Sequence, residues 1–270
     1  MTVATSKQLR LDYPVIFFMA AVHFGALFAL LPSNFSWAAV GVAVFLHWVT
    51  GGLGITLGFH RLVTHRSFQT PKWLEYFLVF CGALSCQGGP IDWVGMHRIH
   101  HLHSDKQTDP HDSNKGFWWS HMGWMLYEIP CRDEISRFTK DIAEDPFYLF
   151  LQKAFFPIQV VLAVALYLVG GWPFVVWGVF ARLVAVFHCT WFVNSATHKF
   201  GYQNYESDDH SKNCWWVALV TYGEGWHNNH HAYQFSARHG IKWWEVDMTW
   251  MTIRILRSLG LATKVKLIGD

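Results

Sequence analysis

The sequence predicts an all-α integral membrane protein, with four transmembrane helices and a cytoplasmic helical cap that carries a histidine-rich metal site. Three observations lead to this expectation. Of the 270 residues, 52% are hydrophobic and only 15% are charged, which is apolar for a soluble domain of this size. The apolar residues gather in long uncharged runs, and many of the 17 histidines gather in short clusters. The formal net charge of +2 gives no indication of a nucleic-acid partner.

Four apolar segments are long enough to be spans, since a helix of about 20 residues crosses a hydrocarbon core of about 30 Å. The predicted spans are 13–31, 37–59, 154–171 and 174–194. The first pair is linked by PSNFS and the second pair by GGWP. Each pair is therefore expected to form a hairpin with a short, uncharged connection.

The basic residues predict the orientation. Apart from Arg182, every one of the 21 Lys and Arg residues lies outside the spans and outside both hairpin links. By the positive-inside rule, both termini and the regions 60–153 and 198–270 face the cytoplasm. The apolar part of residues 71–88 is too short to span, so we expect an interfacial helix there. The whole chain, 1–270, is expected to form one membrane domain.

Histidines cluster where the chain leaves the predicted spans and in the cytoplasmic regions. In HRIHH and HNNHH the offsets are i, i+3 and i+4, which put the side chains on one face of a helix. Asn194 and His198 of NSATH are also four apart. His60 and His65 are five apart, about 140° around an ideal α-helix. They could reach two different metals, or the helix could end between them. The nine clustered histidines are His60, His65, His97, His100, His101, His198, His227, His230 and His231.

These nine histidines lie at one level of the predicted topology, and they exceed the four ligands of a tetrahedral zinc site. Imidazole suits iron, copper, nickel and zinc. Nine nitrogens match two metals with four or five each. Two redox-active irons beside an apolar bundle would indicate oxygen chemistry on a hydrophobic substrate. Unactivated C–H bonds are beyond acid–base catalysis, so no separate catalytic acid or base is assigned.

Several blocks resemble the membrane fatty acyl desaturases, specifically their delta-9 (stearoyl) branch. The blocks are GFHRLVTHRSF, DWVGMHRIHHLHSDKQTDPHD, GFWWSHMGW, TWFVNSATH and GEGWHNNHHAYQFSARHG, and they run from about Gly51 to Trp250. The short chain looks most like bacterial, and especially cyanobacterial, acyl-lipid members. The resemblance implies that the nine histidines bind two Fe²⁺ ions and that Asn194 holds one through a water molecule. It also puts Gln87, Trp93, Thr190 and Trp191 along the substrate.

The resemblance implies an O₂-dependent di-iron delta-9 desaturase that forms a cis double bond between C9 and C10 of a stearoyl- or palmitoyl-type chain. The substrate is expected to be linked to a glycerolipid, with acyl-CoA and an acyl carrier protein as alternatives. Electrons must come from an external donor, a ferredoxin or cytochrome b5. A bacterial plasma or thylakoid membrane is expected. The remaining rivals are a membrane di-iron hydroxylase, a metal transporter, or an electron carrier with haem between His23 and His47.

The methyl end of the substrate is expected to run back between the spans. On an α-helix, Gly52 lies about 12 Å and Trp48 about 18 Å before His60. We therefore expect Trp48 and Gly52 to bound the substrate tunnel.

Charged residues around the site lead to two further expectations. Arg182 lies halfway along the fourth predicted span, so it must find a partner or reach the interface. The acidic residues of SDKQTDPHD are expected to support the ligand histidines or to pair with arginines. The acidic residues are Asp105, Asp109 and Asp112, and the candidate arginines are Arg61 and Arg98.

Overall fold

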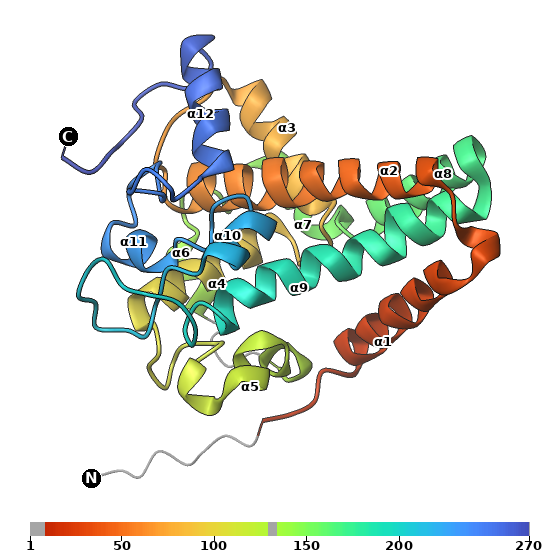
Figure 1. Cartoon of the computed structure of the whole chain (residues 1–270), viewed down its shortest axis with the longest axis horizontal. Coiled ribbons are helices and arrows are strands. Elements are labelled where there is room, and N and C mark those ends of the chain that lie inside the picture. The colour runs from red at the N-terminus through yellow and green to blue at the C-terminus, as the bar shows by residue number, and fades with distance from the viewer. Residues whose placement is uncertain (1–8, 129–133, 270) are drawn as a thin grey trace.

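The computed structural model describes residues 9–128 and 134–269, and over these residues the chain is helical without a β-strand. The all-α prediction is therefore confirmed for the described residues. Figure 1 shows long helices on one side of the molecule and short helices and loops on the other. The main elements are α1 (Tyr13–Leu27), α2 (Trp37–His47), η3 (Trp48–Thr64), α3 (Lys72–Ala83), α4 (Pro90–His103), α5 (Phe117–His121), α6 (Ile135–Phe138), α7 (Pro146–Ala154), α8 (Pro157–Val175), η7 (Val176–Ala181), α9 (Arg182–Ser195), α10 (Trp215–Val220), α11 (His227–Ala232) and α12 (Met248–Ser258). Short 3₁₀ turns are η1 (Phe28–Leu30), η2 (Pro32–Asn34), η4 (Ser113–Lys115) and η5 (Gly123–Leu126).

Three helical stretches of the described chain are long and apolar enough to cross a membrane: Tyr13–Leu30, Trp37–Thr64 and Pro157–Ser195. The third has 39 residues, and a straight helix of that length would measure about 58 Å, nearly twice a hydrocarbon core. Its backbone is non-helical at Gly171 (φ 68°, ψ −162°), within the GGWP link. The chain reverses there, so that α8 packs against η7 and α9 runs back towards the short helices (Figure 1).

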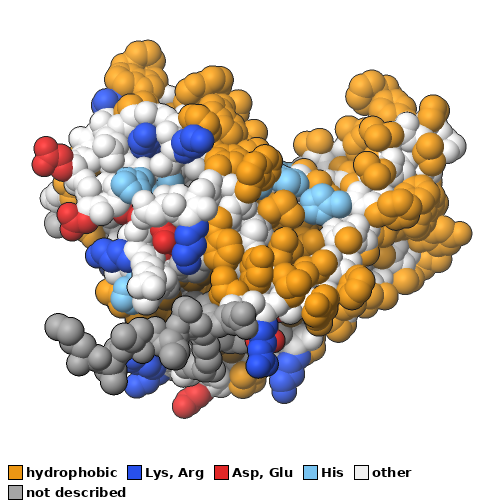
Figure 2. Space-filling view, turned by 90° about the horizontal axis from the view of Figure 1, so that it is seen from below, with side chains coloured by type: hydrophobic (Ala, Val, Ile, Leu, Met, Phe, Trp, Pro, Cys, Tyr) orange, Lys and Arg blue, Asp and Glu red, His pale blue; other side chains and the backbone are white. Residues whose placement is uncertain are grey.

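The outer surface of these long helices is apolar. Leu30, Trp37, Leu168 and Val169 are each more than three-quarters exposed. Figure 2 shows hydrophobic side chains covering this end of the molecule, whereas charged side chains gather at the other end. An apolar exterior without charge is the surface that a lipid environment requires.

The segment η3 continues α2 but is a π-helix over 17 residues, Trp48–Thr64. Glycines let it lie directly against α3. A Cβ atom added at Gly54 would be 2.4 Å from the backbone of Cys81, and one added at Gly58 would be 2.8 Å from the Leu78 carbonyl oxygen. The close packing fixes η3 against α3 and so positions the side chains at the end of η3.

The predicted interfacial helix is shorter than expected. Residues 71–88 were expected to be helical, but α3 ends at Ala83. The following SCQGG turn leaves the helical conformation, with positive φ angles at Cys86 (58°) and Gly88 (98°). One face of α3 is buried through Leu78, while Trp73 on the other face is 62% exposed.

Arg182 is fully buried between α3, α8 and α9, with an exposed fraction of 1%. Its guanidinium donates hydrogen bonds to the Leu84 carbonyl (2.7 Å), the Gln159 side-chain oxygen (3.0 Å) and the Gly178 carbonyl (3.0 Å). The arginine therefore finds partners inside the bundle rather than reaching the interface, and it fastens α9 to the end of α3.

Candidate metal centre

The nine clustered histidines come together in two groups whose candidate ligand atoms lie within 4.8 Å of one another. The larger group draws on η3, α4 and α11, and the smaller group on α4, α11 and the chain just after α9. The smaller group is buried, and the histidines of the larger group are buried or half-buried. The larger group is His60, His65, His97, His101 and His230, and the smaller group is His100, His198, His227 and His231.

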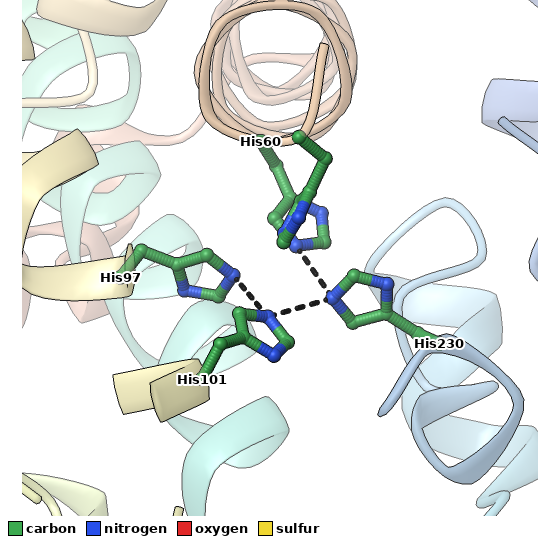
Figure 3. Close-up of side chains that lie close together, drawn as sticks. His60, His97, His101 and His230 are labelled. Carbon is green, nitrogen blue, oxygen red and sulfur yellow. Dashed lines mark hydrogen bonds between the residues drawn. The ribbon is translucent and has the colours of Figure 1, made fainter. Parts of the chain in front are cut away.

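In the larger group the imidazole Nε2 atoms point at one another (Figure 3). The Nε2 of His101 lies 3.0 Å from that of His97 and 2.9 Å from that of His230, and the His60–His230 distance is 3.1 Å. At a metal–nitrogen distance of about 2.1 Å, two nitrogens at right angles are about 3.0 Å apart. These spacings therefore match adjacent ligands of one metal ion.

The π-helix explains how His60 and His65 join the same group. The amide of His65 donates to the His60 carbonyl at 3.1 Å, an i to i+5 hydrogen bond. That pattern places residue i+5 one turn above residue i, and the two imidazole centroids lie 4.7 Å apart. The 140° separation expected from an α-helix does not occur. The helix does end between the two residues, as one of the alternatives held, since η3 ends at Thr64 and His65 is its C-cap.

In four of the nine clustered histidines, a carboxylate contacts the Nδ1 atom, called here the outer nitrogen. The Nδ1 of His198 lies 2.9 Å from an Asp105 oxygen, and that of His100 lies 3.0 Å from Asp109. His231 pairs with Asp209 at 2.5 Å, and His60 with Glu224 at 2.8 Å. A carboxylate beside Nδ1 keeps the proton on that nitrogen and leaves the Nε2 lone pair free to bind a metal.

The protonation of the site follows from burial. Burial, reinforced by neighbouring imidazoles, holds the pKa of His97, His101 and His230 well below the usual value for histidine. Burial also lowers the pKa of His231 to about 4, even though Asp209 opposes the change. These imidazoles are therefore neutral near pH 7, which is the form that binds metal.

The residues fit a pair of metal ions. The Nε2 atoms of His65, His100 and His231 are buried and have no hydrogen-bond partner among the described residues. Leaving a buried polar atom unpaired costs about 1–3 kcal/mol. A cation bound in each group would use these lone pairs, and the donor set of neutral imidazoles suits iron and other transition metals.

A buried network of charged residues holds Glu224, the carboxylate that contacts His60. Arg61 has no exposed surface and donates to Glu224 (3.1 Å), Asp247 (2.9 Å) and the Ala237 carbonyl (2.8 Å). His239 lies 3.0 Å from the same Glu224. Sequence reasoning missed Glu224, although it lies three residues before His227 in GEGWHNNHH.

The predicted pairing of the acidic loop with arginines is wrong. Arg98 pairs with Asp141 at 2.7 Å, and Arg61 pairs with Glu224 and Asp247. Asp105 and Asp109 instead contact ligand histidines, as the alternative expectation held. Asp112 accepts hydrogen bonds from Asn114 and caps the turn η4.

An apolar cavity extends from the two histidine groups towards α2. Its lining includes His60, His97 and His227 from both groups, together with Asn194. The predicted substrate residues Trp93 and Thr190 also line it. The other lining residues are His47, Gly51, Ile55, Thr56, Val186, Cys189, Val193, Val220, Thr221, Tyr222 and Glu224.

The remaining predicted substrate residues lie around this cavity without lining it. Gln87 donates to Thr190 (2.9 Å) and accepts from the Trp93 indole (3.4 Å), so it connects two lining side chains. Trp191 is buried in a neighbouring cluster and stacks on Phe187 with a centroid distance of 5.4 Å.

At the far end of the cavity, Gly51 lines the wall instead of Gly52. Trp48 is 42% exposed, and its indole packs over Gly52, 3.1 Å from an added Cβ. His47 and Tyr222 join across this end through a 2.6 Å hydrogen bond. Trp48 and Gly52 were expected to bound the tunnel, whereas Gly51 lines the cavity. Which of these residues faces the cavity depends on the π-helical turn of η3.

Histidines outside the two groups form a second chain of contacts. His23 on α1 bonds to His188 on α9 (3.2 Å), which bonds to His121 on α5 (2.9 Å). His121 continues to Ser195 at 2.9 Å. His23 therefore makes a hydrogen bond between two helices, α1 and α9. His103 belongs to neither metal group.

The fold and the site define an apolar helical protein with a two-part, histidine-lined candidate metal centre. The chain matches the sequence model of the fatty acid desaturase family over residues 35–258, and it belongs to that family. It is 69% identical over 267 residues to the sn-1 stearoyl-lipid 9-desaturase of Anabaena variabilis, covering 99% of this chain and 98% of that one. It is 65% identical to the sn-1 stearoyl-lipid 9-desaturase of a Synechocystis species, covering 97% and 83%. A Nostoc sn-2 palmitoyl-lipid 9-desaturase is 52% identical, covering 96% and 91%. The predicted resemblance is confirmed.

Proposed function

We propose that this protein is an O₂-dependent di-iron desaturase that forms a cis double bond between C9 and C10 of a saturated acyl chain carried by a membrane glycerolipid. The observation that carries the proposal is the position of the two histidine groups at one end of an apolar cavity. The names of relatives with 69% and 65% identity give the substrate class, a stearoyl chain in a lipid.

We further propose that residues 1–270 form one membrane domain with four spans. The two legs of the long apolar stretch on either side of Gly171 would be separate spans, since the backbone leaves the helical conformation there. Both termini, the helical cap and the histidine groups would then face the cytoplasm, with α3 at the interface. The membrane would be a bacterial plasma or thylakoid membrane.

Each histidine group would hold one iron ion, and Asn194 would hold one of them through a water molecule. Bound iron would supply the oxygen chemistry needed to remove hydrogen from unactivated methylene groups. Overall, two hydrogens leave the acyl chain, and with O₂, two electrons and two protons they give two water molecules. Asp105, Asp109, Asp209 and Glu224 keep the outer protons of the ligand histidines in place, so the inner nitrogens stay available.

The cavity would hold the acyl chain with its reacting carbons at the histidine end. Trp93 stacks on His97 with a centroid distance of 5.2 Å, so it forms a rigid wall beside the larger group. The Gln87–Thr190 hydrogen bond (2.9 Å) ties the turn after α3 to α9 and fixes the width of the passage. Apolar side chains such as Ile55 and Val186 exclude water from the rest of the cavity. Rigid placement would select one methylene pair.

Electrons would come from an external carrier, a ferredoxin or cytochrome b5. The acyl-CoA alternative has some support, because an Anemone leveillei relative named acyl-CoA 5-desaturase is 46% identical over 237 residues. The higher identity to lipid-named relatives favours the glycerolipid.

Lipid analysis tests this proposal. The protein is expressed with a photosynthetic-type ferredoxin in a host without desaturases, alongside the His231→Ala variant. We expect monounsaturated chains in intact glycerolipids for the wild type and none for the variant. Unsaturation that appears first in acyl-CoA would overturn the lipid-linked substrate. Hydroxylated chains, or unchanged lipids despite iron and reductant, would overturn the desaturase itself.

A further inference from the structure

A second, polar cleft reaches the metal centre at histidines that do not line the apolar cavity. It has a volume of about 520 Å³, and its inner wall contains His101 of the larger group and His231 of the smaller group. The centroids of these two imidazoles lie 4.6 Å apart. One cleft therefore leads to both candidate metal positions.

The outer wall of the cleft is acidic. Glu206 and Asp208 are exposed on it, and Asp209 lies deeper, bonded to the Nδ1 of His231 at 2.5 Å. Lys106 is the one basic side chain among the residues that line the cleft. Three carboxylates against one ammonium give the cleft a negative potential, which attracts cations and repels anions.

One of the histidines that line the cleft, His231, has a buried and unpaired nitrogen. The exposed fraction of His231 is 9%, and its Nε2 has no hydrogen-bond partner among the described residues. The outer nitrogen is held by Asp209, so the free lone pair of Nε2 serves a ligand that approaches the centre. A divalent cation is the ligand that both the carboxylates and this lone pair would accept.

The apolar cavity is a poor route for such an ion. A hydrated divalent cation would have to lose its water among apolar side chains such as Ile55 and Val186, at a large desolvation cost. In the polar cleft, carboxylates replace water as the ion moves inwards.

We propose that this cleft is the uptake site through which divalent metal ions load both histidine groups, with Glu206 and Asp208 as a transient binding pair at its mouth. The proposal rests on the metal-binding part of the proposed function. It also separates the roles of the two openings: metal ions use the cleft at His101 and His231, and the acyl chain uses the apolar cavity.

Metal-loading kinetics test the proposal without any turnover. The full-length protein in lipid nanodiscs is stripped of metal, and Co²⁺ uptake is followed by the visible absorbance of the bound ion at low ionic strength. The Glu206→Gln/Asp208→Asn variant should load at least about threefold more slowly than the wild type and still reach the same final Co²⁺ content. The difference should shrink as salt is added. Glu144→Gln removes an exposed carboxylate outside the cleft and should load at the wild-type rate.

The reverse charge change gives an independent check. Lys106→Gln makes the cleft more negative and should speed loading. Equal rates for wild type, the double variant and Lys106→Gln would overturn the proposal, as would equal slowing by Glu144→Gln. A lower final Co²⁺ content in the double variant would also overturn it, since these carboxylates would then be permanent ligands. Failure of the wild type itself to take up Co²⁺ would instead overturn the metal site in the proposed function.

Discussion

Asp105 offers the sharpest test of how the carboxylates support the metal centre. One of its oxygens accepts from His198 Nδ1 (2.9 Å) and from the His210 amide (2.8 Å), and the other accepts from the Ser113 hydroxyl (2.5 Å). All of these groups donate, so the position requires a residue that only accepts. Asparagine has nearly the same shape and tolerates the positive φ of 55°, but its amide nitrogen must face a donor on one side.

In Asp105→Asn, the proton of His198 is no longer fixed on Nδ1, and the smaller histidine group loses one oriented ligand. Loss of such a partner typically weakens metal binding 10–100-fold, or about 1.4–2.7 kcal/mol. The larger group has no contact with Asp105 among the described hydrogen bonds and ion pairs and keeps its ligands.

Competition titration of the metal-free protein with Co²⁺ measures this difference. We expect two equivalents to bind, one with wild-type affinity and one weakened. Asp112→Asn is the matched control, because Asp112 caps the turn η4 in the same loop, and asparagine caps equally well. Equal weakening at both sites, or an unchanged titration, would refute the assigned role of Asp105.

Three further predictions concern the cavity, the buried network and pH. Gly51→Leu should shift the products towards shorter acyl chains, because an added Cβ lies 3.3 Å from the Tyr222 ring. Gly41→Leu, whose Cβ has no neighbour within 4 Å, should leave the fatty-acid profile unchanged. Glu224→Gln should lower the free energy of unfolding by about 3 kcal/mol, measured by denaturant titration, since it leaves Arg61 with a single carboxylate; an unchanged midpoint would contradict the network. Burial lowers the pKa of His97, His101, His230 and His231, that of His231 to about 4, so the unfolded chain binds more protons at these four residues below pH 6.5. The metal-free protein should therefore lose stability as pH falls from 6.5 to 4, by up to about 1.4 kcal/mol per pH unit for each such histidine. A flat stability profile over this range would show that the histidines are already protonated in the folded state.

Much of the histidine site could be predicted from the sequence. The i, i+3 and i+4 spacings within HRIHH and HNNHH place their side chains on one helix face, and α4 and α11 are helices at these positions. The pairing of His60 with His65 could not be derived, because it depends on the π-helix. No local pattern predicts i to i+5 hydrogen bonding over 17 residues.

Contacts between residues that are far apart in the sequence could not be predicted either. Asp209 and His231 are 22 residues apart, and Arg61 and Asp247 are 186 apart. Spacing alone could not show which carboxylates lie beside ligand histidines and which pair with Arg61 or Arg98. The end of the cavity depends likewise on a loop after α10, which brings Tyr222 against His47. The four-span topology stays a prediction, since three stretches of the described residues meet the length and hydropathy of a span.

The iron content of the purified protein shows whether the two histidine groups hold two metal ions. We expect two iron ions per chain for the wild type. Replacement of one ligand in each group, as in the His101→Ala/His198→Ala variant, should lower the content clearly below two. A wild-type content of one or none after reconstitution with Fe²⁺, or two ions retained by the variant, would contradict a centre in which each histidine group holds one metal.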